Sequence, residues 1–237
     1  RAITHLTFAY PEEYPAKYAS AAKELKAMKT AIEIALTSGV LGTNDAALAK
    51  IDAMLTLRDE ALLANPILNF DEVLVVKRHA NAPNLGLPTN WQGNCSMPRT
   101  GYDDEIALLN MKNTSAPLGT LYKPGNKWVG DVDLHFNADK MLFSSTDDNN
   151  RWQIFEINAD GAGLRQITPG DREEVDNYDA CYLPNDNIIF DSTAQMNGVP
   201  CVGGKDYVAN LYLMGPNGEN IRQLCFEQDH DWNPVPL

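Results

Sequence analysis

The chain is short of positive charge and of long apolar runs. Its 237 residues include 19 lysines and arginines against 32 aspartates and glutamates, which gives a net charge of −13. A surface this acidic repels phosphate backbones and anionic lipid, so nucleic-acid binding is disfavoured. No apolar run approaches the roughly 18–20 residues that a membrane-spanning helix needs. The sequence therefore predicts neither a nucleic-acid partner nor a membrane span.

Cysteine and catalytic motifs are also scarce. The spacing of the four cysteines fits no zinc site, and no Cys-x-x-Cys-His motif is present to attach haem. Gly-x-Ser-x-Gly, phosphate-loop and His-Glu-x-x-His motifs are absent as well. We therefore expect no haem, nucleotide or zinc in this segment, while one or two disulfides stay compatible with the count. The cysteines are Cys95, Cys181, Cys201 and Cys225.

Residues 1–66 have a helical composition. The stretch 15–38 is rich in Ala, Lys, Glu and Leu, and its apolar residues recur at steps of three and four. The stretch 43–65 begins with cap-type residues and ends before Pro66, with apolar residues again on one side. These patterns predict a helical hairpin over 1–66 that packs on the next domain or on a partner.

From residue 67 onward, β-branched and aromatic residues alternate with polar ones, and Asn, Asp, Gly and Pro occupy the turns. The hairpin "IFEINADGAGLRQIT" at 154–168 returns as "LYLMGPNGENIRQLC" at 211–225. A second unit occurs at 131–145 and again at 177–193. One unit of each kind gives four strands in about 40–57 residues, which is the size of a β-propeller blade.

The repeats predict blades at about 67–123, 131–169 and 177–226, and a fourth blade that begins at 229. The first blade would carry a long insertion at 79–101. Propellers typically close with four to eight blades. We therefore predict a mainly β fold over 67–237 that is the N-terminal part of a propeller. The remaining part of the same propeller, or a protein partner, would complete the ring.

Two sets of phrases resemble known propellers. The repeats at 152–168 and 209–224 look like those of TolB-type propellers. More narrowly, the stretches at 129–145 and 175–190 resemble bacterial proteins with the propeller domain of the hydrazine synthase alpha subunit. The resemblance covers about 67–237 and implies a propeller fold. Hydrazine synthase works at c-type haems, and because no attachment motif is present, that chemistry is not expected here.

Aspartates recur in the polar strand that opens each repeat. Alternate residues of a strand share one face, so these side chains converge on the central channel if the strand is innermost. They would bind a cation such as Ca²⁺ or a polar ligand such as a sugar, or else accept hydrogen bonds that fix the register between blades. The sequence aligns Asp131 with Asn177 and Asp229, Asp133 with Asp179 and Asp231, and His135 with Cys181 and Asn233.

Three other features are candidates for function. His135 and His230 are natural proton-transfer groups near neutral pH. The insertion presents Trp91 and Arg99, which are residue types that sugar or peptide recognition uses, and which packing also explains. Arg165 and its counterpart in the later hairpin are expected to donate hydrogen bonds between blades.

Three functions compete. The preferred one is an exported recognition propeller that binds a partner protein or a glycan. The first alternative is a carbohydrate-active lyase or hydrolase with a His/Asp site, assisted by a metal, at the channel mouth. The second is a structural subunit of a haem-containing redox complex. The start at Arg1 fits a mature exported protein as well as a trimmed chain.

Overall fold

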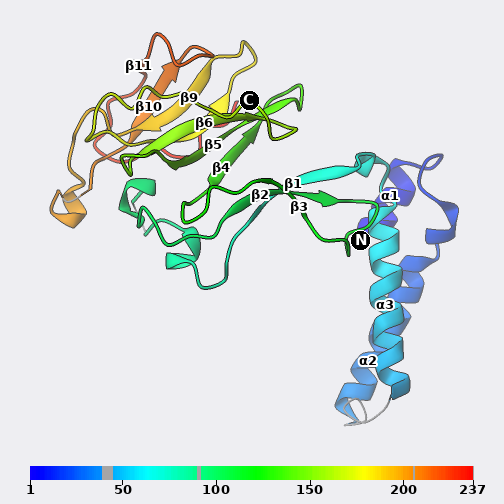
Figure 1. Cartoon of the computed structure of the whole chain (residues 1–237). Helices are drawn as coiled ribbons and strands as arrows, with labels where there is room; N and C mark the ends of the chain where they lie inside the picture. The colour runs from blue at the N-terminus through cyan, green and yellow to red at the C-terminus, as the bar shows by residue number, and fades with distance from the viewer. Residues whose placement is uncertain (39–44, 90–91, 205, 237) are drawn as a thin grey trace. The chain divides into compact units, whose positions relative to one another are not determined.

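The computed structural model describes residues 1–38, 45–89, 92–204 and 206–236, of which 45–47 are described by their backbone alone. The chain divides into two compact units, Arg1–Asp71 and Glu72–Leu237 (Figure 1). The sequence pattern places its boundary after residue 66. Among the described residues, no helix has the length and apolar character needed to cross a membrane.

The first unit is helical. It contains α1 (Ala2–Ala9), α2 (Ala21–Thr37) and α3 (Asp45–Leu63), and a 3-10 turn at Ala16–Tyr18. Helices α2 and α3 correspond to the two stretches with apolar residues at helical spacing, and α1 precedes them. The Tyr14 hydroxyl donates a 2.6 Å hydrogen bond to the Ala61 carbonyl and ties the segment before α2 to α3. The buried core comprises Ile3, Leu6, Tyr14, Tyr18, Ala21 and Ala61.

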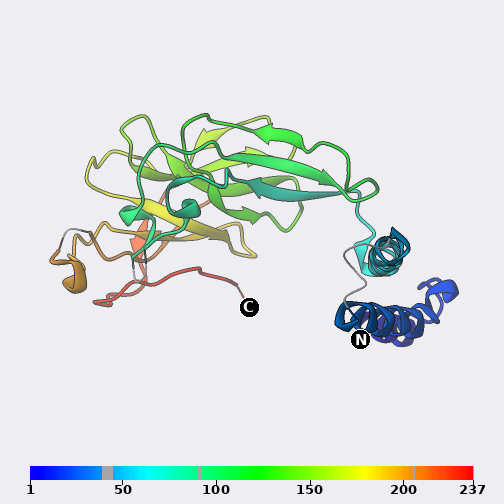
Figure 2. The same cartoon turned by 90° about the horizontal axis from the view of Figure 1, so that it is seen from below.

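The second unit consists of three antiparallel sheets (Figures 1 and 2). The first sheet has the order β1 (Glu72–Lys77), β2 (Glu105–Asn110), β3 (Gly119–Tyr122). The second has the order β4 (Gly130–Leu134), β5 (Lys140–Thr146), β6 (Trp152–Asn158), β7 (Arg165–Gln166). The third has the order β8 (Asn177–Tyr182), β9 (Ile188–Ser192), β10 (Asn210–Met214), β11 (Arg222–Gln223). Short 3-10 turns lie at Pro66–Leu68, Pro83–Gly86, Asn94–Ser96 and Pro200–Val202.

The sheets pack face to face, and the second sheet lies between the other two. Successive residues of a strand point to opposite faces, so β5 serves two cores. Met141 and Phe143 belong to the core shared with the first sheet, whereas Leu142 belongs to the core shared with the third. All three side chains are fully buried. This two-sided packing is what successive sectors of a propeller require.

The first sheet corrects one expectation. A four-stranded blade over 67–123 is wrong, because only three strands form there among the described residues and β1 is an edge strand. The missing strand would pair with β1 in the way that β4 pairs with β5 in the second sheet. The residues before β1 instead form the turn Pro66–Leu68, in which the Asn65 side chain accepts a hydrogen bond from the Ile67 backbone N–H.

The 229–236 segment runs along the third sheet without forming a strand. The Asp231 N–H donates to the Ala209 carbonyl at 3.0 Å, and the Asn233 N–H donates to the Asp179 carboxylate at 2.6 Å. The segment therefore occupies the position where the next repeat begins.

Candidate ligand site

The first strands of the second and third sheets, β4 and β8, which we call the inner strands, each contain a residue with a left-handed backbone near their start, and the 229–236 segment contains a third such residue. Asp131 and Asp179 have φ values of 48° and 53°, and Asn233 has a φ of 50°. The pairing of β4 with β5 and of β8 with β9 shifts register at this point, which marks a β-bulge. Asp and Asn tolerate this conformation better than other non-glycine residues. The three repeats therefore align at Asp131, Asp179 and Asn233.

This alignment corrects the one read from the sequence. The sequence pattern made Asp133, Asp179 and Asp231 equivalent, which is wrong by two residues at the first and last positions. Asp133 pairs with Leu142 in the way that Cys181 pairs with Ile189, so those two inner-strand residues correspond. The bulge adds a residue to the strand, and nothing in the alternation of polar and apolar residues reveals it.

The repeated aspartates connect successive repeats. The Asp179 carboxylate accepts the Asn233 N–H at 2.6 Å. The Asp133 carboxylate accepts the Tyr182 N–H at 2.9 Å, and the Asp179 N–H donates to the Ser144 hydroxyl at 2.9 Å. One oxygen of each of these carboxylates is thus engaged in fixing register, as the structural alternative in the sequence predicts. Among the described residues, the second oxygen of Asp179 has no hydrogen-bond partner.

The bulged residues line a cavity of about 500 Å³ on the inner side of the three sheets. The first sheet contributes Arg78, which directly follows β1, and the insertion contributes Gln92 and Asn94. The second and third sheets contribute the two bulged aspartates. The 229–236 segment contributes Trp232 and Asn233. The cavity therefore collects side chains from all three sheets, from the insertion and from the following segment.

The charges in the cavity are unevenly balanced. The Arg78 guanidinium is engaged by Asp104, at 3.0 Å, and by the Val129 carbonyl, at 2.7 Å. Burial and the charge of Asp179 raise the pKa of Asp131 to about 6, although hydrogen bonds from Ser144 and Asn94 oppose the rise. Burial also raises the pKa of Asp179. The two carboxyl groups therefore favour ligand groups that donate hydrogen bonds.

The insertion is held against the sheets by specific contacts. Arg99 forms two hydrogen bonds to the Asp176 carboxylate, at 2.9 and 2.8 Å, and lies outside the cavity lining. Asn94 donates to the Asp131 carboxylate at 2.6 Å. A side chain at Gly93 would collide with the Tyr178 hydroxyl, so glycine allows the loop to approach β8. Trp91 lies outside the described residues.

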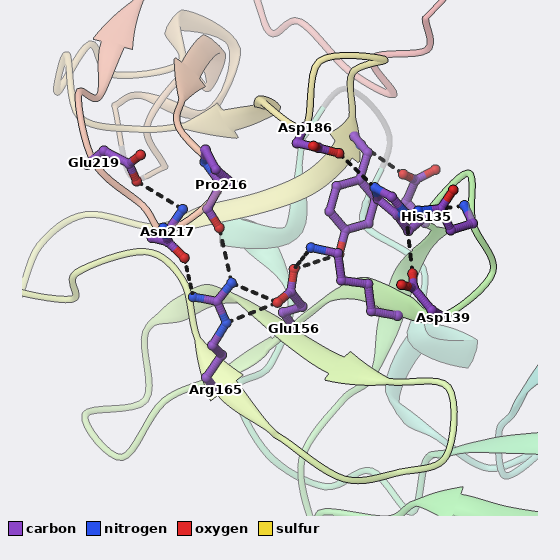
Figure 3. Close-up of polar contacts among 12 residues, drawn as sticks. His135, Asp139, Glu156, Arg165, Asp186, Pro216, Asn217 and Glu219 are labelled. Atoms are coloured by element: carbon purple, nitrogen blue, oxygen red, sulfur yellow. Dashed lines mark hydrogen bonds and ion pairs between the residues drawn. The ribbon is translucent and has the colours of Figure 1, made fainter.

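His135 lies away from this cavity. It follows β4, whose first residues line the cavity, so it is roughly 13 Å from Asp131 along the strand. Its ring is buried and contacts Asp186 through Nε2 at 2.9 Å and Asp139 through Nδ1 at 3.3 Å (Figure 3). The ring also packs edge-on against Tyr182, with 4.8 Å between centroids. His135 therefore belongs to the joint between the second and third sheets.

Arg165 belongs to the same joint and acts as the sequence predicts. Its guanidinium bonds the Glu156 carboxylate at 2.7 Å within the second sheet, and the Pro216 carbonyl at 3.1 Å and Asn217 at 3.2 Å in the third sheet (Figure 3). Burial raises the pKa of Glu156, but hydrogen bonds from Arg165, Tyr182 and Lys140 outweigh it, so the net shift is downward. The carboxylate is therefore held ionised between the sheets.

His230 and the neighbouring aspartates hold the 229–236 segment. His230 Nδ1 accepts the Ala209 N–H at 3.0 Å, which places the ring proton on Nε2 in the neutral form, and burial lowers the pKa of this ring. Asp231 accepts hydrogen bonds from the Cys225 thiol at 2.7 Å and from Asn210 at 3.2 Å. The Asp229 carbonyl also accepts from Asn210, at 3.2 Å. None of these three side chains lines the cavity.

Metal and disulfide sites receive no support from the geometry. Within the described ranges, no group of three or more His, Cys, Asp or Glu side chains is placed to hold a metal ion. The four cysteines are free.

Several lining residues were missed in the sequence. Arg78, Trp128 and Trp232 lie in the cavity wall without belonging to the aspartate pattern. Trp232 directly precedes Asn233, and Trp128 lies three residues before Asp131, so a tryptophan near two of the three left-handed residues was the signal available.

The sequence matches no known protein-family profile and no curated protein. Its structure is similar to one from Agrobacterium tumefaciens provisionally identified as TolB, with 16% identity and a TM-score of 0.43, covering 56% of this chain and 42% of that one. TolB from Acinetobacter baumannii has 14% identity and a TM-score of 0.41, and the match covers 55% of this chain and 28% of that one. Puromycin hydrolase has 14% identity and a TM-score of 0.43, and the match covers 66% of this chain and 22% of that one. The chain thus spans less than half the length of these proteins.

Proposed function

We propose that Glu72–Leu237 is part of an exported β-propeller recognition module that binds a small polyhydroxylated ligand, such as one or two sugar units, in the cavity beside Asp179. The observation that carries the proposal is the cavity itself. Its volume of about 500 Å³ falls in the range typical of small-molecule sites, roughly 300–1,000 Å³. Polar groups from two repeats and the insertion converge there.

The blade arrangement is part of this proposal. Two four-stranded sheets follow one another with face-to-face cores between neighbours, and the inner strand of each opens on a bulged aspartate. A channel lined by the start of each inner strand is the expected result of such an arrangement. The cavity lies where that channel would be, because both bulged aspartates line it.

The lining suits hydroxyl groups. Trp232 is 44% exposed, and the stack of its ring on His230, with 5.5 Å between centroids and planes 22° apart, holds the indole in place. An indole face packs against the C–H groups of a sugar ring, while carboxylate and amide groups bond its hydroxyls. The second oxygen of Asp179, Asn94 and Gln92 supply those groups. The excess of carboxylates over available cations disfavours an acidic sugar.

Binding can be measured by calorimetry with a panel of neutral mono- and disaccharides. We expect at least one to bind, and Trp232→Ala and Asp179→Asn each to weaken binding by at least tenfold. Phe226→Ala is the matched control, because Phe226 is 75% exposed and is not part of the cavity lining. No binding by any neutral sugar, or binding that Trp232→Ala leaves unchanged, contradicts the proposal.

The enzymatic alternative has no observation in its favour. A glycosidase or lyase would need its proton-transfer group beside the ligand. Neither His135 nor His230 lines the cavity, and the Nδ1 atom of His230 is occupied by a backbone N–H.

A further inference from the structure

Asn94 and the two bulged aspartates form one contiguous group in the cavity wall. The Asn94 amide donates to the Asp131 carboxylate at 2.6 Å, and the backbone N–H of Asp179 bonds the same carboxylate. All three residues line the cavity. They come from the insertion, the second sheet and the third sheet, so three separate elements hold them in place. We call these three side chains the acceptor group.

Asn94 presents an unused hydrogen-bond acceptor to the cavity. A carboxylate can only accept, so the amide nitrogen faces Asp131 and the amide oxygen faces away from it. No described residue donates to that oxygen, and unlike the unpaired side-chain oxygen of Asn210 it is not sealed off from solvent. Asn94 is only 6% exposed and lines the cavity, so the oxygen is reached through the cavity. The side chain is therefore positioned for a ligand group that donates a hydrogen bond.

The charge beside the acceptor group is negative and unbalanced. Arg78 is the one cation among the described lining residues, and its guanidinium bonds the fully buried Asp104 carboxylate at 3.0 Å. The charges that act on the nearby Asp191 are those of Asp179, Asp131 and a third aspartate, which are all negative. The carboxylates of the acceptor group thus have N–H donors around them but no counter-charge of their own in the described part of the chain.

Trp232 supplies an open aromatic face in the same cavity. One side of its ring stacks on His230, and the residue is 44% exposed. Trp128, the other indole of the cavity wall, is 3% exposed and already carries the Arg78 guanidinium over its ring, at 5.0 Å from the centroid. An indole face attracts a cation more strongly than the other aromatic rings do. The open face of Trp232 is therefore suited to a positive group as well as to C–H groups.

A primary ammonium group matches these features better than a hydroxyl group does. It carries three hydrogen-bond donors and no lone pair, whereas a hydroxyl carries one donor and two lone pairs. The unpaired oxygens of Asp179 and Asn94 accept only, so the lone pairs of a hydroxyl would face them without gain. An ammonium group also supplies the missing positive charge, and charge-assisted hydrogen bonds are about twice as strong as neutral ones.

We propose that the preferred ligand of this cavity is an amino sugar, whose ammonium group bonds Asp179 and Asn94 beside the Asp131 carboxylate while its ring lies on Trp232. The inference rests on the function proposed above and narrows the ligand class from hydroxylated compounds to those with one free amine. Acetylation of that amine removes its charge and two of its three donors. An N-acetylated sugar of the same shape is therefore bound no better than the parent sugar.

Matched ligands test this on the purified 237-residue chain. Calorimetry at about pH 7, where carboxylates are ionised and an amine is protonated, compares glucosamine, N-acetylglucosamine and glucose, and the same three forms of galactose. We expect at least one amino sugar to bind about tenfold or more tightly than both of its counterparts. Added salt should weaken binding of the amino sugar more than binding of the hydroxyl sugar.

The outcomes of this series separate the two proposals. Equal affinities within each set of three would overturn the preference for an amine and leave the neutral-sugar site standing. If no member of either set binds, this inference and the proposed function both fail. The comparison uses the unaltered chain, so it does not depend on the folding of any variant.

Asp131→Asn tests where the ammonium group lies. Asn keeps an acceptor for the Asn94 amide and tolerates the left-handed backbone, so the variant should fold, which circular dichroism checks. Without the charge, the ratio of affinities for the amino sugar and its hydroxyl counterpart should fall by about fivefold or more. A ratio that stays unchanged would refute this placement.

Asp160→Asn is the matched control for that variant. It makes the same change of charge in the exposed turn after β6, outside the cavity lining, where the side chain accepts the Ala162 N–H at 2.9 Å. Asn can accept the same bond, so the ratio of affinities should not change. An equal fall in both variants would mean that the net charge of the chain attracts the amine, and would overturn the proposed site.

Discussion

Asp191 is a fully buried carboxyl group in the third sheet. It pairs with Tyr178 in the third sheet as Ser144 pairs with Gly130 in the second. The Ser144 hydroxyl accepts a hydrogen bond from the next repeat, whereas neither carboxyl oxygen of Asp191 has a hydrogen-bond partner among the described residues. Burial, and then the charge of Asp179, raises the pKa of Asp191 to about 10. The side chain is therefore neutral in the folded protein at pH 7.

This carboxyl group should make stability depend on pH. Its pKa in the unfolded chain is about 3.9, so as pH rises from about 4 to about 10 the unfolded chain loses this proton while the folded chain keeps it. The contribution of this group to the free energy of unfolding is therefore largest below pH 4 and falls as the pH rises toward 10. Asp191→Asn keeps the shape without the charge and should gain about 2–4 kcal/mol at pH 7. Thermal melts of both proteins at pH 4 and pH 8 measure this, and an equal difference at the two pH values contradicts it.

At the scale of elements, the joint between the second and third sheets depends on Arg165. Arg165→Ala removes its bonds to Glu156 and to the turn at Pro216, and leaves a buried carboxylate with fewer donors. We expect a loss of about 1–3 kcal/mol in the free energy of unfolding, measured by denaturant titration.

Arg172→Ala is the matched control for that experiment. Arg172 pairs with Glu174 at 3.2 Å, and both side chains are about half exposed, at 47% and 50%. Exposed pairs contribute little, so the change should stay within about 0.5 kcal/mol. Equal losses in the two variants would show that Arg165 does not join the sheets.

The strands could be predicted because their signal is local. Alternation within "KMLFSS" and "WQIFEI" specifies β5 and β6, and the Asp-Gly turn specifies the hairpin that leads to β7. The bulges at Asp131 and Asp179 could not be predicted, because a bulge changes the pairing between strands and leaves composition unaltered. The repeats were aligned on their recurring aspartates without this pairing, and the alignment was off by two residues at two of its three positions.

The cavity was predicted only in part for a related reason. The aspartates could be identified because they recur in each repeat, and two of them, Asp131 and Asp179, line the cavity. Arg78 and Trp232 come from opposite ends of the row of sheets, 154 positions apart in the sequence. Their proximity follows from the order of the sheets and from the bulges, which the repeat pattern does not specify. His135 follows β4 and lies outside the cavity lining.

At the scale of the whole molecule, the account depends on sheets arranged as sectors with their inner strands facing one channel. A strongly acidic chain keeps its carboxylates apart or pairs them with donors. Here the inner carboxylates bond the backbone N–H groups of the following repeat, so they fix register and line the cavity at once. The proposed ligand site follows from that arrangement.

An experimental structure of the 237-residue chain at side-chain resolution tests this claim most directly. The account predicts that β4 and β8 lie side by side as inner strands, with Asp131 and Asp179 in the left-handed conformation and facing one cavity with Trp232. Inner strands on opposite faces of a sandwich, or an Asp179 carboxylate turned away from the Asn233 N–H, would contradict it.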